Sequence, residues 1–287
     1  MISLCRGSLE APVAGCRSCT TAVQGIVDEA HLLVGVITCH RLLQEARLSD
    51  SSIIPHGWLD GWMDSQEIAL WGVADLRDFP TPQDEKGKRF PIALSMVFPM
   101  TPLVIASIQG GPNPAYADEY ARVNRQIDEL SKELAAEIAG RGFQARSLPA
   151  TVRTDTTLMR GDFPHKTAAT RAGLGWIGRH CQLITRRFGS WIRLGTVFTD
   201  LELTSGRPIE RNFCGHCMRC VDACPAKALK GKAWCPGLPR EELLDVQACD
   251  HWKKEHYIQY HNGHICGICS SVCPYGIRVL RQAANIG

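Results

Sequence analysis

Nine of the 14 cysteines fall between Cys214 and Cys273, and their spacing is that of iron–sulfur ligands. The first run is Cys214-x-x-Cys217-x-x-Cys220-x-x-x-Cys224-Pro225. In such a run, three thiolates bind one [4Fe–4S] cluster and the fourth binds a second cluster. A tight loop directs the first three sulfurs inward, and the proline redirects the chain. The run therefore predicts a protein that moves electrons.

A second run has the same ending but one cysteine fewer: Cys266-x-x-Cys269-x-x-x-Cys273-Pro274. Two clusters need eight thiolates, so one more ligand must come from the segment between the runs. Cys235 and Cys249 are the two candidates. We choose Cys249 because it follows a plausible short helix over 241–248, whereas Cys235 lies in a loop.

The crossed pattern assigns the eight thiolates to two clusters. Cluster 1 takes Cys214, Cys217, Cys220 and Cys273, and cluster 2 takes Cys224, Cys249, Cys266 and Cys269. A pair of structural zinc sites is the alternative, but it fits two Cys-Pro endings poorly. A purely structural role for the clusters ranks lowest, because two adjacent clusters form a conduction path that stability does not require.

Composition and charge indicate an ordinary globular protein of the cytoplasm. The formal charge of +3 over 287 residues gives no argument for a nucleic-acid or membrane partner. The apolar run 30–39 is far shorter than the roughly 20 residues of a membrane-spanning helix. We recognise no secretory signal, and thiols stay reduced in the cytosol, so the cysteines indicate metal rather than disulfides.

The elements before the cysteine runs predict an α+β fold. Strands are expected near 71–75, 90–98 and 143–148, and a helix over 116–139 follows from apolar residues at three- and four-residue steps. The order strand, helix, strand suggests an α/β layer domain. We divide the chain into an extension of unclear role (1–62), an α/β cofactor and substrate domain (63–205) and a small ferredoxin-like double [4Fe–4S] domain (206–287).

A glycine-rich turn, Gly173-x-Gly175-x-x-Gly178, matches a dinucleotide-binding fingerprint by letter. That fingerprint requires a strand before it and a helix after it. Here the Ala-rich segment 165–172 is expected to be helical, and strand-like runs follow at 182–185 and 190–199. The turn therefore predicts a close approach of the backbone to a flat cofactor or to another strand, and not a nicotinamide site.

The segment Ala172-Gly-Leu-Gly-Trp-Ile-Gly178, followed by Gly189-Ser190-Trp, Leu194-Gly195, Thr199-Asp200 and the paired cysteine runs, resembles epoxyqueuosine reductases. Those enzymes are relatives of the reductive dehalogenases. The resemblance covers roughly residues 70 to 280. It implies a cobalamin held near the glycine turn and supplied with electrons by the two clusters. The residues expected to contact it are Gly173, Gly175, Trp176, Gly178 and Ser190.

The resemblance also implies an acid that precedes the glycine turn and donates a proton to the substrate. Asp155 and Asp162 bracket the expected position, and Asp155 is slightly favoured. The implied partners are a low-potential electron donor, such as flavodoxin or ferredoxin, and tRNA carrying epoxyqueuosine or an unidentified small molecule. The alternative is a non-enzymatic ferredoxin-type electron carrier. A roomy pocket beside Trp176 would favour the enzyme, and a filled interior would favour the carrier.

Overall fold

The computed structural model describes residues 57–284, which belong to one compact unit, His56–Gly287. The segments on either side of the predicted boundary at 206 fold together in this unit. Residues 1–56, which include most of the predicted extension and the apolar run 30–39, lie outside the described part. Within residues 57–284, every helix is too short or too polar to cross a bilayer.

The core of the unit is a four-stranded sheet in the order β1-β2-β6-β3. Its strands are β1 (Leu70–Asp75), β2 (Ile92–Pro99), β6 (Ile192–Thr199) and β3 (Ala145–Leu148). All three strand pairs are antiparallel, and Leu94 in β2 stands opposite Val73 in β1 and Val197 in β6. The predicted strands are confirmed, and the antiparallel sheet places the chain in the α+β class.

Helices cover both faces of the sheet. Successive side chains of the buried strand β2 point to opposite faces, so the strand packs against helices on both sides. Residues Ile92, Leu94, Met96 and Phe98 pack on the side of α4 (Pro114–Gly140). Ala93 and Val97 pack on the side of α5 (His165–Arg171), whose Ala168 and Ala169 allow a close approach. Every residue of β2 except Pro99 is buried, so this strand forms the centre of the molecule.

Helix α4 begins and buries its side chains as the sequence predicts. Asn113 caps it by accepting a hydrogen bond from the Tyr116 N–H at 2.9 Å, and Pro114 occupies the first turn, where no N–H is needed. Its buried face carries Val123, Ile127, Leu134 and Ile138. Helix α5 likewise confirms the helix expected near 165–172.

The predicted domain start at 63 is wrong, because helix α2 (Trp58–Ser65) runs across it. Leu59 and Met63 lie one turn apart and are completely buried against the sheet. The guanidinium of Arg141, just beyond α4, stacks 3.8 Å from the centre of the Trp58 ring. Residues 58–62 are therefore part of the core and not of an extension.

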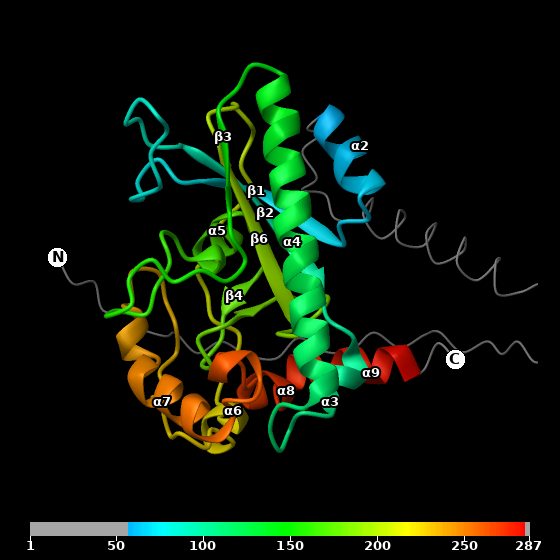
Figure 1. The fold of residues 1–287 in the computed structure, drawn as a ribbon, viewed down its shortest axis with the longest axis vertical. Helices are drawn as coiled ribbons and strands as arrows, with labels where there is room; N and C mark the ends of the chain where they lie inside the picture. Colours follow the sequence, from blue (N-terminus) through cyan, green and yellow to red (C-terminus); the bar gives the residue numbers. More distant parts are fainter. Residues whose placement is uncertain (1–56, 285–287) are drawn as a thin grey trace, which may run out of the picture. The chain divides into compact units, whose positions relative to one another are not determined.

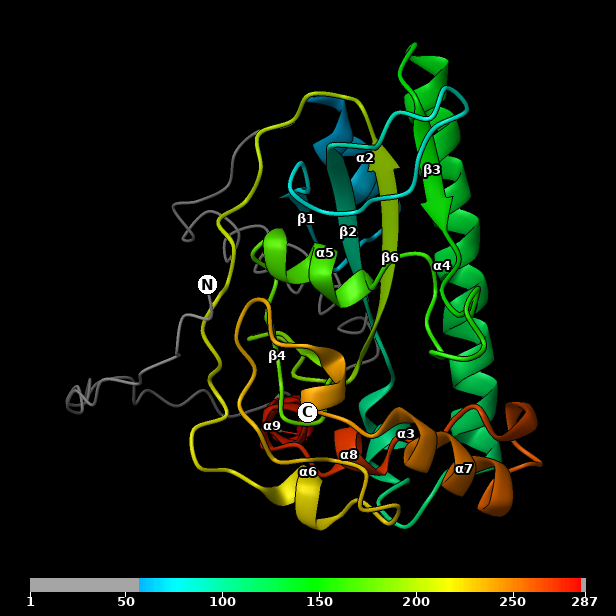
Figure 2. The ribbon, with the colours of Figure 1, turned by 90° about the vertical axis from the view of Figure 1, so that its left-hand side faces the viewer.

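Short helices gather at one end of the sheet (Figures 1 and 2). They are α3 (Pro102–Ala106), α6 (Arg219–Asp222), α7 (Val246–His256), α8 (Ile268–Ser271) and α9 (Pro274–Ala284), with 3-10 turns at Arg240–Glu242 and His261–Gly263. A hairpin of β4 (Trp176–Ile177) and β5 (Leu183–Ile184) belongs to this end of the unit. The helix predicted over 241–248 is wrong: Asp245 caps a later helix, α7, and Cys249 lies inside it.

Truncation of the buried face of α4 tests this core. Leu134→Ala should lower the free energy of unfolding by about 2–5 kcal/mol, because it removes a fully buried side chain between helix and sheet. Urea unfolding under anaerobic conditions measures the change. Lys132→Ala, on the exposed face of the same helix, is the control and should change it by about 0.5 kcal/mol or less. Equal effects of the two substitutions would contradict the packing described here.

Candidate functional site

The first cysteine run folds into a tight loop that leads into α6. The Cys214 N–H is held by the Asn212 side chain at 2.8 Å, and the Cys217 N–H donates to the Cys214 carbonyl at 3.1 Å. Burial, together with the neighbouring thiols of Cys273, Cys214 and Cys217, raises the pKa of the Cys220 thiol to about 12. The four thiols expected to bind cluster 1 therefore lie together.

The four thiols expected to bind cluster 2 line one cavity of about 180 Å³. They come from the end of α6, from α7 and from both sides of the start of α8: Cys224, Cys249, Cys266 and Cys269. Burial, together with the neighbouring thiols of Cys249 and Cys224, raises the pKa of Cys266 to about 11. Burial also raises the pKa of Cys269, where thiols of both sets contribute. The two sets are therefore neighbours.

The eight thiols are better suited to bind iron than to form disulfides with one another. None of the eight forms a disulfide. Within residues 57–284, no three His, Cys, Asp or Glu side chains are placed to hold a single metal ion. Burial disfavours the thiolate form, and cluster iron would supply the positive charge that offsets it. Cys235, the other candidate for the eighth ligand, does not line the cavity of the cluster 2 thiols; its chain neighbours Trp234 and Pro236 line a second, larger cavity.

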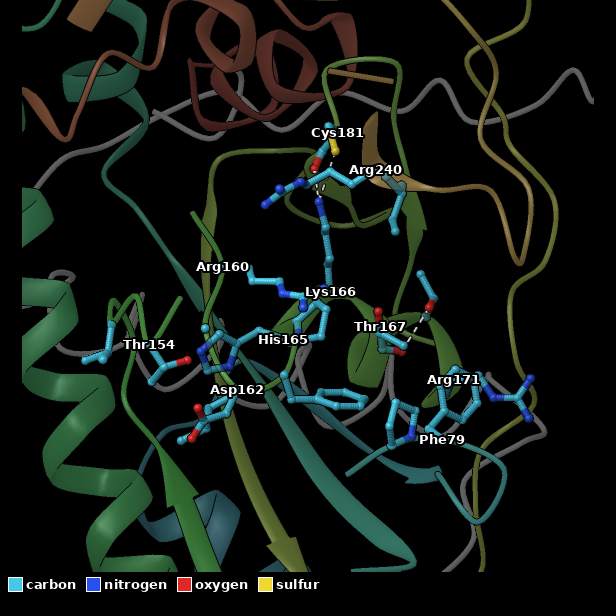
Figure 3. Close-up of a pocket in the computed structure, with 18 of the residues that line it drawn as sticks. Phe79, Thr154, Arg160, Asp162, His165, Lys166, Thr167, Arg171, Cys181 and Arg240 are labelled. Carbon is cyan, nitrogen blue, oxygen red and sulfur yellow. Dashed lines mark hydrogen bonds between the residues drawn. The ribbon is translucent and has the colours of Figure 1, made fainter. Parts of the chain in front are cut away.

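The larger cavity has a volume of about 1190 Å³. It lies between the loops that follow β3, helix α5 and the segment 234–243 of the cysteine-rich region. Figure 3 shows Lys166 extending from α5 across this cavity toward Cys181. The Lys166 ammonium donates hydrogen bonds to the carbonyl oxygen of Cys181 at 2.7 Å and to its Sγ at 3.0 Å.

One wall of the large cavity also packs against cluster 1 ligands. We call it the shared wall, formed by Ile177, Cys181, Trp234, Leu238 and Leu243. The same residues belong to an apolar group that contains Cys273 and Cys214. The cavity wall and two of the proposed cluster 1 ligands therefore belong to one continuous apolar group.

A half-buried histidine, His165, organises the opposite side of the cavity. Burial lowers the pKa of His165 to about 4, so its ring is neutral at physiological pH. One ring nitrogen lies 2.8 Å from the Thr196 hydroxyl in β6 and the other lies 3.1 Å from the Pro149 carbonyl oxygen. His165 thus ties the loop after β3 to the sheet, and it has no ring nitrogen left for a ligand.

Asp155 and Asp162, the two predicted proton donors, both line the large cavity. Asp162 pairs with Arg146 at 3.1 Å, and Asp155 pairs with Arg160 at 3.4 Å. Each carboxylate side chain is about one third exposed, at 35% and 34% respectively. Neither is the deeply buried acid that would suit proton donation best, but both have access to the cavity and to solvent.

The glycine turn is packed closely against other backbone, and four of the predicted cofactor contacts lie outside the lining of the large cavity. A Cβ on Gly173 would lie 2.6 Å from the Arg207 carbonyl oxygen, and one on Gly175 would overlap the Ile184 carbonyl. Trp176 is buried with its ring edge-on to Phe213 and Tyr275. Gly173, Gly175, Trp176 and Gly178 do not line the large cavity; their neighbours Ile177 and Cys181 do.

Ser190, the fifth predicted cofactor contact, lies with the cluster ligands. Its hydroxyl donates to the Ser270 carbonyl at 3.2 Å, and the Ser270 hydroxyl donates back to the Ser190 carbonyl at 2.9 Å. Burial raises the pKa of Cys273, and a hydrogen bond with Ser190 acts in the opposite direction. Ser190 therefore connects the turn at the start of β6 to a proposed cluster 1 ligand.

Lys166, Cys181 and His180 are site residues that the sequence analysis missed. They lie on either side of the glycine turn in the sequence. Their position beside this motif was the feature from which they could have been predicted. Arg153 was also missed: it lines the cavity and pairs at 2.8 Å with Asp250 in α7. Asp250 is only 2% exposed and adjoins Cys249, so this ion pair joins the cavity loop to the helix that carries the eighth thiol.

Comparisons with known proteins agree with this arrangement. Residues 213–276 match the 4Fe-4S double cluster binding domain. The epoxyqueuosine reductase of Gloeobacter violaceus is 30% identical over 193 residues, which are 60% of this chain and 54% of that protein. The enzyme of Synechocystis sp. is 33% identical over 175 residues, with coverage of 57% and 54%. The chain thus spans about half the length of these curated relatives.

The fold is that of a solved reductive dehalogenase, whose structure suggests a mechanism for B12-dependent dehalogenation. The TM-score is 0.55 at 19% identity, and the match covers 76% of this chain and 32% of the other. The chain is an iron–sulfur protein with a double-cluster domain that resembles the epoxyqueuosine reductases in sequence and a reductive dehalogenase in fold.

Proposed function

We propose that this protein is a reductase that passes electrons through two [4Fe–4S] clusters to a corrinoid in the large cavity, where a bound substrate is reduced. The observation that carries the proposal is the shared wall. A cavity of about 1190 Å³ has a wall that belongs to the same apolar group as the cluster 1 ligands Cys214 and Cys273. An electron carrier alone has no use for such a space, since its clusters exchange electrons at the protein surface.

The proposed ligands keep the crossed assignment. Cluster 1, beside the shared wall, is held by Cys214, Cys217, Cys220 and Cys273. Cluster 2 is held by the thiols that line the smaller cavity: Cys224, Cys249, Cys266 and Cys269. The influence of Cys220 on the pKa of Cys269 supports a short path between the clusters. Electrons from a low-potential donor such as flavodoxin or ferredoxin would enter through cluster 2. Basic residues outnumber acidic ones over 206–287, which suits an acidic donor.

The large cavity fits a corrinoid in size and lining. Pockets for drug-sized ligands measure roughly 300–1,000 Å³, so this one suits a larger cofactor. Its lining includes the buried Arg171 Nε, which has no hydrogen-bond partner in the structure. Lys166 offers a cation that forms hydrogen bonds only to Cys181 and is not within ion-pair distance of any described acid. A bound corrinoid would supply low-potential cobalt chemistry, while these side chains hold its polar groups.

The chain's own residues would position the substrate and supply the proton. Asp155 and Asp162 are the alternatives for the donor, because both residues line the cavity and both side chains are partly exposed to solvent. Arg240 donates to the carbonyl oxygens of Leu158 at 2.6 Å and Met159 at 3.1 Å, which fixes the loop that carries Asp155. The proposed substrate, by the likeness to epoxyqueuosine reductases, is epoxyqueuosine in tRNA, with an unidentified small molecule as the alternative.

Removal of the eighth thiol tests the cluster assignment. Anaerobically reconstituted protein should hold about eight irons per chain. Cys249→Ala should hold fewer and lose the electron paramagnetic resonance signal of one cluster, because one iron of cluster 2 loses its ligand. Cys235→Ala is the matched control and should keep eight. Eight irons in Cys249→Ala, or a loss in Cys235→Ala alone, would overturn the assignment.

Cofactor retention tests the proposed function itself. Wild-type protein purified anaerobically with cobalamin should keep a corrinoid, with absorption distinct from that of the clusters. Thr167→Trp adds bulk to the cavity from α5 and should abolish retention without loss of iron (Figure 3). Lys132→Trp, on the exposed face of α4, should retain the corrinoid. A wild-type protein with eight irons and no corrinoid would favour the electron-carrier alternative.

The proton donor is tested with an epoxyqueuosine-modified tRNA stem loop as substrate. One of the variants Asp155→Asn and Asp162→Asn should lower kcat by about 10²–10⁴, the usual contribution of a general acid. The other should change it much less, since its carboxylate only pairs with an arginine. Corrinoid and iron contents must match wild type in both. Full activity in both variants would exclude either aspartate as the donor.

A further inference from the structure

Exposed side chains around α6 form a basic surface that includes one large apolar side chain. Met218, just before the helix, is 37% exposed, and Arg219, the first residue of the helix, is exposed as well. Lys227 and Lys230 follow the helix and are also exposed. We call these four residues the α6 patch. Figures 1 and 2 show α6 among the short helices at the end of the unit, away from the sheet.

The segment 227–231 packs against α6 and so brings the patch residues together. A Cβ on Gly231 would lie 2.6 Å from the Cε atom of Met218. The Lys227 ammonium donates a hydrogen bond at 3.5 Å to the carbonyl oxygen of Asp222, the last residue of α6. The α6 patch is therefore built from two segments that contact each other.

Arg179 ties this second segment to the loop of the first cysteine run. Its guanidinium donates hydrogen bonds to the carbonyl oxygens of Gly231 and Gly215, the latter at 2.6 Å. Gly215 lies between the proposed cluster 1 ligands Cys214 and Cys217. The α6 patch is thereby attached to the backbone that carries cluster thiols.

The α6 patch has an excess of positive charge. Among residues 57–284, no acid lies within ion-pair distance of Arg219, Lys227 or Lys230. Asp222 is the exposed acid beside them. Arginine and methionine are enriched at protein interfaces, and binding partners present complementary charge to each other. The α6 patch therefore fits a protein partner with an acidic surface.

The α6 patch also adjoins the thiols of both proposed clusters. Helix α6 contains the cluster 1 ligand Cys220, and the cluster 2 ligand Cys224 follows its end. The Lys227 N–H donates a hydrogen bond to the Cys224 carbonyl oxygen at 3.1 Å. Cys224 belongs to the same apolar group as the cluster 2 ligands Cys249 and Cys269. A partner bound to the patch would therefore lie beside a turn that carries a cluster 2 ligand.

We propose that the α6 patch is the docking surface for a small acidic electron-carrier protein that reduces cluster 2. The proposal rests on the cluster part of the proposed function and does not require the corrinoid. The reduced carrier gives up one electron per encounter, and the oxidised cluster takes up that electron. Attraction between the patch and carboxylates of the carrier raises the association rate, and salt weakens this attraction.

Stopped-flow reduction of the reconstituted full chain tests this surface. Flavodoxin and ferredoxin are reduced beforehand, and the loss of visible cluster absorption is followed under anaerobic conditions. With the faster of the two donors, the wild-type rate constant should fall as salt is added. At low salt, the double variant Arg219→Glu/Lys230→Glu should lower it by about 10-fold or more, because electrostatic steering is lost.

Lys86→Glu/Lys132→Glu is the matched control, because it changes the net charge equally at exposed lysines of the β1–β2 loop and of α4. It should leave the rate within about twofold of wild type, since screening limits the reach of distant charges. Equal rates in the two double variants, when both hold eight irons, would overturn the proposal. Failure of both donors to reduce a fully loaded wild-type protein would also overturn it.

Carbodiimide cross-linking of the wild-type protein to the same donor gives a readout that needs no variant. Carboxylates of the donor should form amide bonds with Lys227 or Lys230, located by mass spectrometry, and high salt should suppress these links. This measurement decides if the patch variant loses iron. Links found only at lysines outside the α6 patch would overturn the proposal. Failure to retain a corrinoid would overturn the reductase and leave this result intact.

Discussion

The structure depends on the gathering of eight buried or half-buried cysteines at one end of an antiparallel sheet. Burial raises the pKa of several of them, so the group is stable as thiolates only when positive charge lies between them. Clusters would supply that charge and replace a hydrophobic core in a region built from short helices. In the crossed assignment, cluster 1 binds both Cys273 and the loop around Cys214. A bound cluster would therefore connect the first and the last cysteine of this segment.

The sheet and the cysteine-rich segment are two parts of one site. The turn between α5 and β4 is packed so closely that side chains on its glycines would overlap neighbouring backbone. This packing presents Ile177 and Cys181 to the large cavity and His180 to the smaller one. The Arg153–Asp250 pair and the Arg240 hydrogen bonds join the cavity loop to the cluster region. These contacts therefore join the large cavity to the region of the cluster thiols.

The local elements were predictable wherever a periodic pattern of apolar residues was strong. Helix α4 and strands β2 and β6 follow directly from their spacing, and a helix precedes the glycine turn and a strand follows it, as predicted. Helix α2 was missed because its eight residues carry too short a pattern. The helix near Cys249 was displaced because its start is determined by the Asp245 cap.

The sequence by itself determined the chemistry of the cysteines, since the ligands of a cluster are set by residue type and by spacing within a loop. It also carries the resemblance to epoxyqueuosine reductases, on which the proposal of a corrinoid rests. Only the tertiary structure decided which side chains face the cavities, because that depends on contacts between residues far apart in the chain. Gly175 looked like a cofactor contact and packs against Ile184, whereas Cys181 and His180 occupy the walls of the two cavities. A pattern of letters identifies a turn that needs glycine, and the fold determines what approaches it.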